Sequence, residues 1–245
     1  MKQKFHVPIL VGLASFLFLL NLGGYDLWPP DEPRFAQVAR EMLTTGDYLA
    51  PHINGQPYTE KPPVLFWLTA LVSKPFGDVT EFSARLPLAI GGILTVLFTY
   101  FLAQSLYGTR VAFWAALILM TTHRFWWQAR FGQIDMVMTT FLTSALLCFW
   151  QWHRHRRTTA LVGFYLSLAF AVLTKGPPGL VFPLLMVITF YWKRKPDRKA
   201  LQLGLGMSFV ALLVATWLIP ARMAISVERG VDTSDGIAAN LFRQT

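Results

Sequence analysis

"LPLAIGGILTVLFTYFLAQSL", residues 86–106, carries no charged side chain over 21 consecutive positions. A helix needs about 20 apolar residues to cross the roughly 30 Å hydrocarbon core of a bilayer, so this stretch predicts a transmembrane helix. Comparable apolar stretches occupy residues 5–25, 111–127, 136–152, 158–174, 177–192 and 200–220. The sequence therefore predicts an all-α fold, a polytopic membrane helix bundle with about seven transmembrane helices.

The composition agrees with a membrane protein. Of 245 residues, 54% are hydrophobic and only 14% are charged, which leaves too little polar surface for a soluble domain of this size. The net charge of +9 does not indicate nucleic-acid binding, because the basic residues form short clusters between apolar stretches instead of one face. A single cysteine, Cys148, excludes an intramolecular disulfide and fits no zinc-binding spacing.

Two apolar segments need separate treatment. Residues 63–76 are too short to span, contain Lys74 and are bracketed by prolines, so they predict a re-entrant or interfacial helix. Residues 5–25 follow a basic start and resemble a signal peptide in that respect. No small-x-small cleavage pattern follows them, and we interpret them as a membrane anchor.

The basic clusters predict the orientation, because Lys and Arg in short loops concentrate on the cytoplasmic side. With seven spans and a cytoplasmic N-terminus, the inner segments hold eleven Lys and Arg against one acid, Asp197. They are residues 1–4, the turn at Arg110, residues 154–157 and residues 193–199. Four other charged stretches then share the outer, non-cytoplasmic side: residues 29–34, 58–63, 130–135 and 173–178.

The first outer stretch starts an amphipathic helix that we expect to lie at the membrane surface. Its apolar side chains recur at helical spacing up to the stop signal at Gly46: Phe35, Val38, Ala39, Met42 and Leu43. Asp31 could simply cap this helix through its carboxylate. Capping needs only one acid, so it does not explain Glu32 or the preceding Trp-Pro-Pro.

Structural roles also compete for the other outer charges. Lys61 and Lys175 could snorkel to the headgroups, and Lys61 could pair with its neighbour Glu60. Arg130 and Asp135, five residues apart, could form an ion pair at a span end.

Taken together, the outer charges indicate a site for a phosphate-bearing lipid. Cations at headgroup depth would neutralise the phosphate, and a carboxylate could act as general base on an incoming hydroxyl or amine. The candidate phosphate-binding cations are Arg34, Lys61, Arg85, Arg130 and Lys175, and the candidate catalytic acids are Asp31, Glu32 and Asp135.

The order "DEPR", "EKPP", "RFGQID" and "TKGPP" resembles the GT-C membrane glycosyltransferases of the protein O-mannosyltransferase and aminoarabinose transferase type. The similarity covers about residues 26–222. It implies transfer of a sugar from a polyprenyl-phosphate donor, with inversion, to a lipid such as lipid A, a glycan or a protein. It further implies an integral protein of a bacterial-type inner membrane whose active site faces away from the cytoplasm.

The resemblance also implies residue roles. Asp31 matches the acid that acts as base, with Glu32 supporting it, and Asp135 matches a second acid near the active site. Lys61 matches the lysine that binds the lipid phosphate, with Arg85 or Lys175 as helpers. Some members hold a divalent metal near the residue that matches Glu60, but no second ligand is evident here.

Members of this family usually continue through further spans and often a soluble domain. We expect residues 1–245 to form a single transmembrane core that lacks those parts. Two other functions remain open at this point. A flippase for a lipid-linked sugar would also place cations at headgroup depth, but it predicts charged or unwound positions at the bilayer midplane as well. A non-catalytic assembly subunit would use the acids only as caps.

Overall fold

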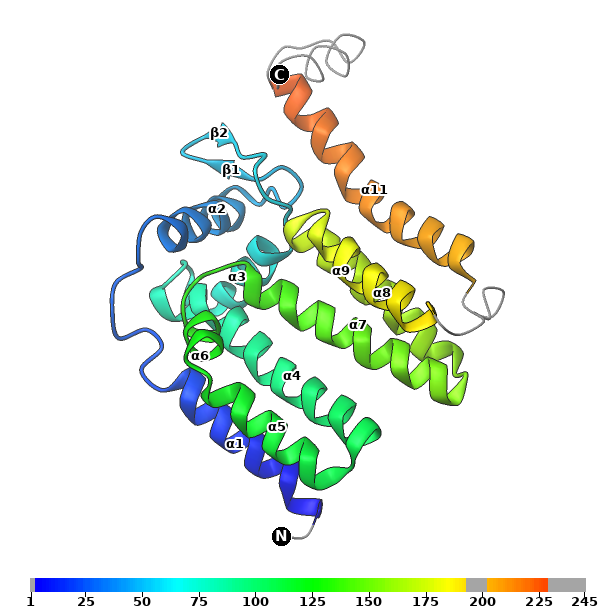
Figure 1. The fold of residues 1–245 in the computed structure, drawn as a ribbon. Helices are drawn as coiled ribbons and strands as arrows, with labels where there is room; N and C mark the ends of the chain where they lie inside the picture. Colours follow the sequence, from blue (N-terminus) through cyan, green and yellow to red (C-terminus); the bar gives the residue numbers. More distant parts are fainter. Residues whose placement is uncertain (1–2, 193–201, 229–245) are drawn as a thin grey trace.

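The computed structural model describes residues 3–192 and 202–228, and most of these residues are helical (Figure 1). Two strands, β1 (His52–Ile53) and β2 (Gln56–Pro57), form a small antiparallel hairpin, and two 3-10 turns lie at Gln3–Phe5 and Lys74–Phe76. The α-helices are α1 (His6–Leu19), α2 (Asp31–Thr45), α3 (Val64–Ser73), α4 (Glu81–Tyr107), α5 (Thr109–Thr121), α6 (His123–Arg130), α7 (Asp135–His155), α8 (Thr158–Lys175), α9 (Pro178–Tyr191) and α11 (Leu203–Glu228).

The long helices run back and forth between two ends of the molecule (Figure 1). The α4–α5 and α7–α8 turns lie at one end, while α2, α3, the hairpin and the α6–α7 loop lie toward the other. This alternation agrees with the predicted order of spans and separates the basic turn at residues 154–157 from α2. The all-α membrane fold predicted from the sequence is confirmed by these helices and by the structural relatives described below.

Length and hydropathy identify three helices that could cross a membrane alone, α4, α8 and α11, among the described residues. The pair α6 and α7 would add a fourth if the two helices formed one span, but they meet at an angle of 113°. Residues 6–19, 64–76, 109–121 and 178–191 form shorter apolar helices. The count of seven spans therefore stays a prediction, while apolar helices occupy all the predicted positions.

Three predicted spans have different bounds in the structure, and the last of them, 200–220, corresponds to α11, which runs from Leu203 to Glu228. The stretch 111–127 is interrupted at Thr122, whose extended backbone ends α5 before α6 begins. The stretch 5–25 is helical only to Leu19. The amphipathic α6 then folds against the end of α1, where the Trp126 indole Nε1 donates to the Leu17 carbonyl at 3.1 Å. Residues 200 and 201 of the last predicted span lie outside the described residues.

Small residues let the helices approach closely, as is usual in membrane bundles. A Cβ added at Gly92 in α4 would lie 2.8 Å from the Ala129 Cβ atom of α6. By contrast, α9 and α11 expose large apolar side chains, including Phe182, Leu185, Leu205 and Leu212, each more than half exposed. An apolar face of this kind suits contact with lipid tails.

The predicted amphipathic helix is confirmed as α2, which ends at Gly46 with a φ of 75°. It buries Phe35, Val38, Ala39 and Met42 against α3 and the neighbouring core. Residues 64–76 form α3 and a 3-10 turn, a short apolar segment as predicted. Because α3 packs on both α2 and α4, these elements form one end of the core on which the charged residues are placed.

Candidate functional site

The first group of charged residues lies at the start of α2. Asp31 is the first helical residue, and it follows a cis peptide bond between Pro29 and Pro30. No side chain caps the helix, so the interpretation of Asp31 as an N-cap is wrong for this structure. The Asp31 carboxylate instead accepts a hydrogen bond from Arg34 Nη2 at 2.5 Å, and 40% of its side chain remains exposed. Asp31 is therefore accessible to a ligand.

Residues from the loop after the hairpin complete this group. Glu60 Oε2 lies 3.5 Å from Arg34 Nη1 and accepts from the Tyr58 hydroxyl at 3.4 Å. Burial raises the pKa of Tyr58 to about 12, so its hydroxyl keeps its proton and can donate. Lys61 is half-buried and makes no hydrogen bond or ion pair within residues 3–192 and 202–228, so the expected Glu60–Lys61 pair does not form there. Lys61 is thus available to bind an anion.

Glu32, next to Asp31, has a different environment. Its side chain and that of Arg85 are 4% and 0% exposed, and they form an ion pair with Arg85 Nη2 2.7 Å from Glu32 Oε2. A second hydrogen bond joins Arg85 Nε to Glu32 Oε1 at 3.0 Å. Loss of one partner from a buried pair leaves an uncompensated charge and typically costs about 3–5 kcal/mol. Neither side chain is exposed to a ligand.

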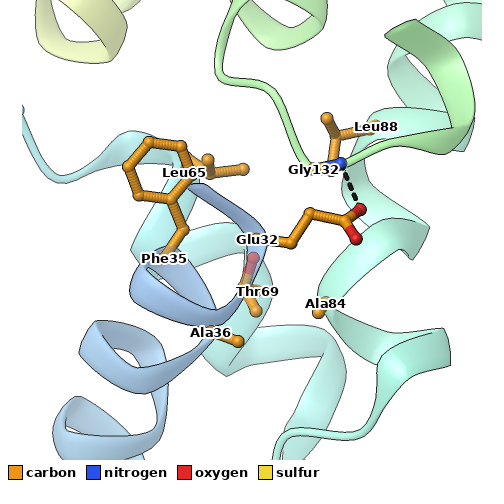
Figure 2. A pocket seen from close by; sticks show the side chains of 8 residues that line it. All are labelled: Glu32, Phe35, Ala36, Leu65, Thr69, Ala84, Leu88 and Gly132. Atoms are coloured by element: carbon orange, nitrogen blue, oxygen red, sulfur yellow. Dashed lines mark hydrogen bonds between the residues drawn. The ribbon is translucent and has the colours of Figure 1, made fainter. Parts of the chain in front are cut away.

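The same glutamate contacts the loop between α6 and α7. Glu32 Oε1 accepts from the Gly132 backbone N–H at 2.5 Å, and Figure 2 shows this carboxylate directed at Gly132. The small cavity beside it has a volume of about 10 Å³, room for one water molecule, and is lined by apolar residues that include Phe35, Leu65 and Leu88. The Glu32–Arg85 pair therefore lies in a nearly dry environment.

The second group lies where α7 begins and α8 ends. Lys175, the last residue of α8, forms an ion pair with Asp135, the first residue of α7, and each side chain is 32% exposed. An acid at a helix N-terminus and a base at a helix C-terminus both interact favourably with the helix dipoles. The pair is accessible, so Lys175 could exchange its carboxylate partner for a phosphate.

Arg130 does not pair with Asp135, so that expectation is wrong. Its Nη1 donates to the carbonyls of Leu17 at 3.0 Å and Leu20 at 2.8 Å, at the end of α1. The side chain is buried, and it also lies over the Trp126 ring. Arg130 therefore satisfies carbonyls that the end of a helix leaves without partners.

The predicted residues thus form two accessible groups and two buried structural contacts. Asp31, Arg34, Glu60 and Lys61 form the first group, and Asp135 with Lys175 forms the second. The Glu32–Arg85 pair lies between them, since Glu32 follows Asp31 and hydrogen-bonds Gly132, three residues before Asp135. The contacts of Tyr58 with Glu60 and of Gly132 with Glu32 were not predicted from the sequence, because no charge or spacing pattern marks these two residues.

A divalent metal does not fit the residues around Glu60. Its carboxylate contacts a guanidinium and a hydroxyl, and a cation at Arg34 would repel a metal ion. In the described ranges, no three His, Cys, Asp or Glu residues come together as a metal site. No metal-dependent step is therefore assigned to these residues.

Comparison with known proteins identifies the family. The family model of dolichyl-phosphate-mannose-protein mannosyltransferases matches residues 5–229. The chain belongs to this family. The resemblance found in the sequence motifs is thereby confirmed.

Several bacterial relatives are named as aminoarabinose transferases. The undecaprenyl phosphate-alpha-4-amino-4-deoxy-L-arabinose arabinosyl transferase 2 of Pseudomonas fluorescens Pf-5 is 32% identical over 199 residues, which is 79% of this chain and 34% of the relative. The corresponding transferase of Aeromonas salmonicida A449 is 32% identical over 214 residues, 84% of this chain and 39% of the relative. The chain thus spans between a third and two fifths of the length of these mannosyltransferase-family relatives.

Solved structures of the family support the fold. ArnT from Cupriavidus metallidurans, bound to undecaprenyl phosphate, superposes with a TM-score of 0.80 at 25% identity, covering 93% of this chain and 42% of ArnT. The Saccharomyces cerevisiae Pmt1–Pmt2 protein O-mannosyltransferase complex has a TM-score of 0.63 at 20% identity, covering 92% of this chain and 33% of that chain, and shows the fold alone. The membrane helices and the family together identify this chain as an integral membrane protein.

Proposed function

We propose that this chain is the catalytic membrane core of a glycosyltransferase. It transfers a sugar, with inversion, from a polyprenyl-phosphate donor to a lipid, glycan or protein acceptor outside the cytoplasm. The observation that carries this proposal is the placement of two residues in neighbouring segments at one end of the bundle: the accessible acid Asp31, and Lys61, a cation with no ion pair among the described residues. A carboxylate and an available cation at one site match the needs of this reaction.

The reaction is a single displacement at the anomeric carbon. The bond to the phosphate oxygen breaks while the acceptor hydroxyl or amine forms a new bond from the opposite face, and Asp31 takes the acceptor's proton. Negative charge grows on the departing phosphate, so a positioned cation stabilises the transition state more than the ground state. Lys61 supplies this charge, and Lys175 adds a second cation when it leaves Asp135.

The buried contacts lead us to assign other roles to three predicted site residues. Arg85 and Arg130 use their side chains on carbonyls and carboxylates of the protein, so we assign them to the scaffold and not to the phosphate. Glu32 is equally enclosed and is not a base. Arg34 bridges Asp31 and Glu60, and it orients the base while remaining one-third exposed to the donor.

The relatives suggest the donor. Several are named as undecaprenyl phosphate-aminoarabinose transferases, and one superposed structure contains undecaprenyl phosphate. We propose undecaprenyl phosphate as the carrier, a 4-amino-4-deoxyarabinose-type sugar as the group transferred, and a lipid A-like acceptor. The chain would lie in the bacterial inner membrane with its N-terminus in the cytoplasm.

No observation favours a flippase. Such a protein would place ionisable side chains near the membrane midplane. The buried Asp, Glu, Lys, Arg and His side chains instead lie at or near helix ends in the described part of the chain: His6, Glu32, Arg85 and Arg130. Sugar transfer is therefore the function that we put to the test.

The proposal is tested by Asp31→Asn in the full chain, reconstituted with a radiolabelled polyprenyl-phosphate sugar and lipid acceptor. Asparagine keeps the size of the side chain and its hydrogen bond to Arg34 but removes the base, so transfer should fall about 10²–10⁴-fold. Asp78→Asn is the matched control, since Asp78 also pairs with an arginine, Arg40, at 2.7 Å but lies outside the site. Undiminished transfer by Asp31→Asn would remove the proposed base.

A further inference from the structure

The Glu32–Arg85 pair has every hydrogen-bonding position occupied. Arg85 offers five N–H donors: Nε and Nη2 reach Glu32, and the others reach backbone carbonyls of Leu22 at 3.1 Å, Tyr25 at 2.8 Å and Asp26 at 2.9 Å. Each Glu32 oxygen accepts two hydrogen bonds, one from Arg85 and one from a backbone N–H. A pair so completely satisfied has no capacity left for a ligand.

These hydrogen bonds join segments that are far apart in the sequence. Arg85 belongs to α4 and donates to the backbone carbonyls of residues 22, 25 and 26 in the segment that connects α1 to α2. Glu32 belongs to α2 and binds the backbone N–H of Trp28 at 2.7 Å and of Gly132 at 2.5 Å. The pair therefore fixes both the start of α2, which carries Asp31, and the loop that leads into Asp135.

The surroundings leave the pair little freedom to shift. The guanidinium carbon of Arg85 lies 4.0 Å from the centre of the Tyr25 ring and 6.0 Å from that of Phe131, so aromatic rings cover it. A Cβ atom added at Gly132 would lie 2.7 Å from Glu32 Cγ. Only glycine lets the loop approach this closely, so the loop position depends on the glutamate and on the absence of a side chain at residue 132.

We propose that Glu32, Arg85 and Gly132 are positioning residues for the transfer reaction, which fix the separation between the Asp31 segment and the Asp135 segment. This inference rests on the proposed function, because it assigns the two acid-bearing segments to one active site. Loosening the unit displaces the acids relative to each other without removing either one. A displacement of about 1 Å in an active site can reduce the rate about 100-fold.

Two variants disturb the unit by independent routes. In Glu32→Gln, one oxygen becomes an amide nitrogen, and whichever oxygen is replaced, a donor then faces two N–H donors. In Gly132→Ala, both charges remain and the new methyl group pushes against Glu32. Arg40→Gln is the control, because Arg40 also makes an ion pair, with Asp78, but lies nine residues after Asp31 on α2 and contacts none of Asp31, Glu32 and Gly132.

The test uses the full chain in nanodiscs and measures kcat and KM for the polyprenyl-phosphate sugar. We expect kcat to fall at least about tenfold in Glu32→Gln and Gly132→Ala, toward the 100-fold loss typical of misplacement, with KM within about twofold of the original value. Arg40→Gln should keep both constants. A fall in kcat that only matches the loss of folded protein, with KM unchanged and with folding measured by dye labelling of Cys148 on heating, would show a stability effect and overturn the proposal.

A distance measurement tests directly whether Glu32 and Gly132 hold the two acid-bearing segments at a fixed separation. Spin labels at Trp28→Cys and Gln133→Cys, in a Cys148→Ser background, report the separation of the two segments. We expect a narrow distance distribution that broadens in Glu32→Gln and Gly132→Ala. An unchanged distribution in both variants, or a broadened one with unaltered kcat, overturns the positioning role. If the unsubstituted chain transfers no sugar, the proposed function fails, while the distances still show whether the unit holds these segments.

Discussion

At the scale of single residues, the charges predicted to bind a phosphate divide into accessible and enclosed ones. Lys61 is half-buried and makes no ion pair within the described ranges. Lys175 forms a partly exposed ion pair with Asp135. Arg85 and Arg130 donate to buried carbonyls. A ligand can therefore reach the two lysines without breaking the fold, which makes their roles separable from those of the arginines by experiment.

Lys61 should contribute to binding of the donor phosphate through its positive charge. Lys61→Gln removes the cation from the site and should raise KM for the donor about 10–100-fold, which corresponds to loss of a hydrogen bond to a charged group. Lys61→Arg should restore much of the affinity. The exposed Lys74, which lies over the Tyr48 ring, provides the control Lys74→Gln. Equal KM values for the donor in Lys61→Gln and the original protein would exclude this lysine from phosphate binding.

Arg130 should contribute through stability. Arg130→Gln leaves the carbonyls at the end of α1 without their charged donor, and the free energy of unfolding should fall by about 1.5–3 kcal/mol. The exposed neighbour Arg124 gives the matched control Arg124→Gln, which should have little effect. Denaturation in detergent measures both variants. If Arg130→Gln loses donor binding at unchanged stability, Arg130 binds the phosphate after all.

The sequence predicted which charged residues lie near the candidate site more reliably than it predicted the partners of their side chains. Arg130 and Asp135 are five residues apart, and their spacing left an ion pair open, but the chain bends between α6 and α7 and each residue has other partners. The acids of the "DE" motif were expected to act together. Instead, Asp31 is exposed and Glu32 is buried because adjacent helical residues point in different directions. Contacts of this kind depend on packing that spacing along the chain does not specify.

At the scale of elements, the hairpin packs against α2, the helix that carries Asp31. Glu41 on α2 accepts hydrogen bonds from the backbone N–H groups of Asn54 at 2.6 Å and Gly55 at 3.1 Å, the two turn residues of the hairpin. Both turn residues have positive φ, 52° and 72°, which an Asn-Gly turn readily adopts. The Glu41 carboxylate thus holds the hairpin to α2.

This contact should depend on pH. Burial favours the protonated form of Glu41, but hydrogen bonds from Gln37 and from the backbone of Gly55 and Asn54 outweigh it and lower its pKa below 4.5. A lowered folded-state pKa means that the stabilisation is present above the unfolded value and is lost as pH falls through the folded value. Amide exchange protection at Asn54 and Gly55 should therefore decrease below about pH 4.5.

The matched variant for this prediction is Glu41→Gln, whose protection should be lower and independent of pH in that range. The hydrogen bond from Arg40 also lowers the pKa of Asp78, and Asp78→Asn shows whether that pair contributes. Protection that stays constant from pH 6 to pH 3 in the unsubstituted protein would contradict the role of Glu41.

The elements themselves were largely predictable. The bounds of α2 followed from its apolar periodicity and from Gly46, and those of α7 and α8 from apolar stretches between basic turns. The break between α5 and α6 at Thr122 was not predictable, because no proline or glycine marks it in the sequence. It depends on the docking of α6 onto α1, a tertiary contact that local sequence does not encode.

At the scale of the whole molecule, the helix bundle has two ends of different character. One end carries the α4–α5 turn, next to Arg110, and the basic α7–α8 turn at residues 154–157 (Figure 1). The other end carries the segments around residues 31, 61, 85, 132 and 175 (Figure 1). The distribution of Lys and Arg predicts that the first end is cytoplasmic. The proposed active site then opens toward the outer headgroups, where a lipid-linked sugar and its acceptor can meet.

The proposed transfer reaction requires the two acid groups to share the outer side of the membrane. Single cysteines at Asp31, Gln133 and Arg157, each in a Cys148→Ser background, can be labelled in intact cells with a membrane-impermeant maleimide. We predict labelling at residues 31 and 133 from outside, and at residue 157 only after the membrane is opened. Labelling of residues 31 and 133 from opposite sides would contradict the shared site and the transfer reaction built on it.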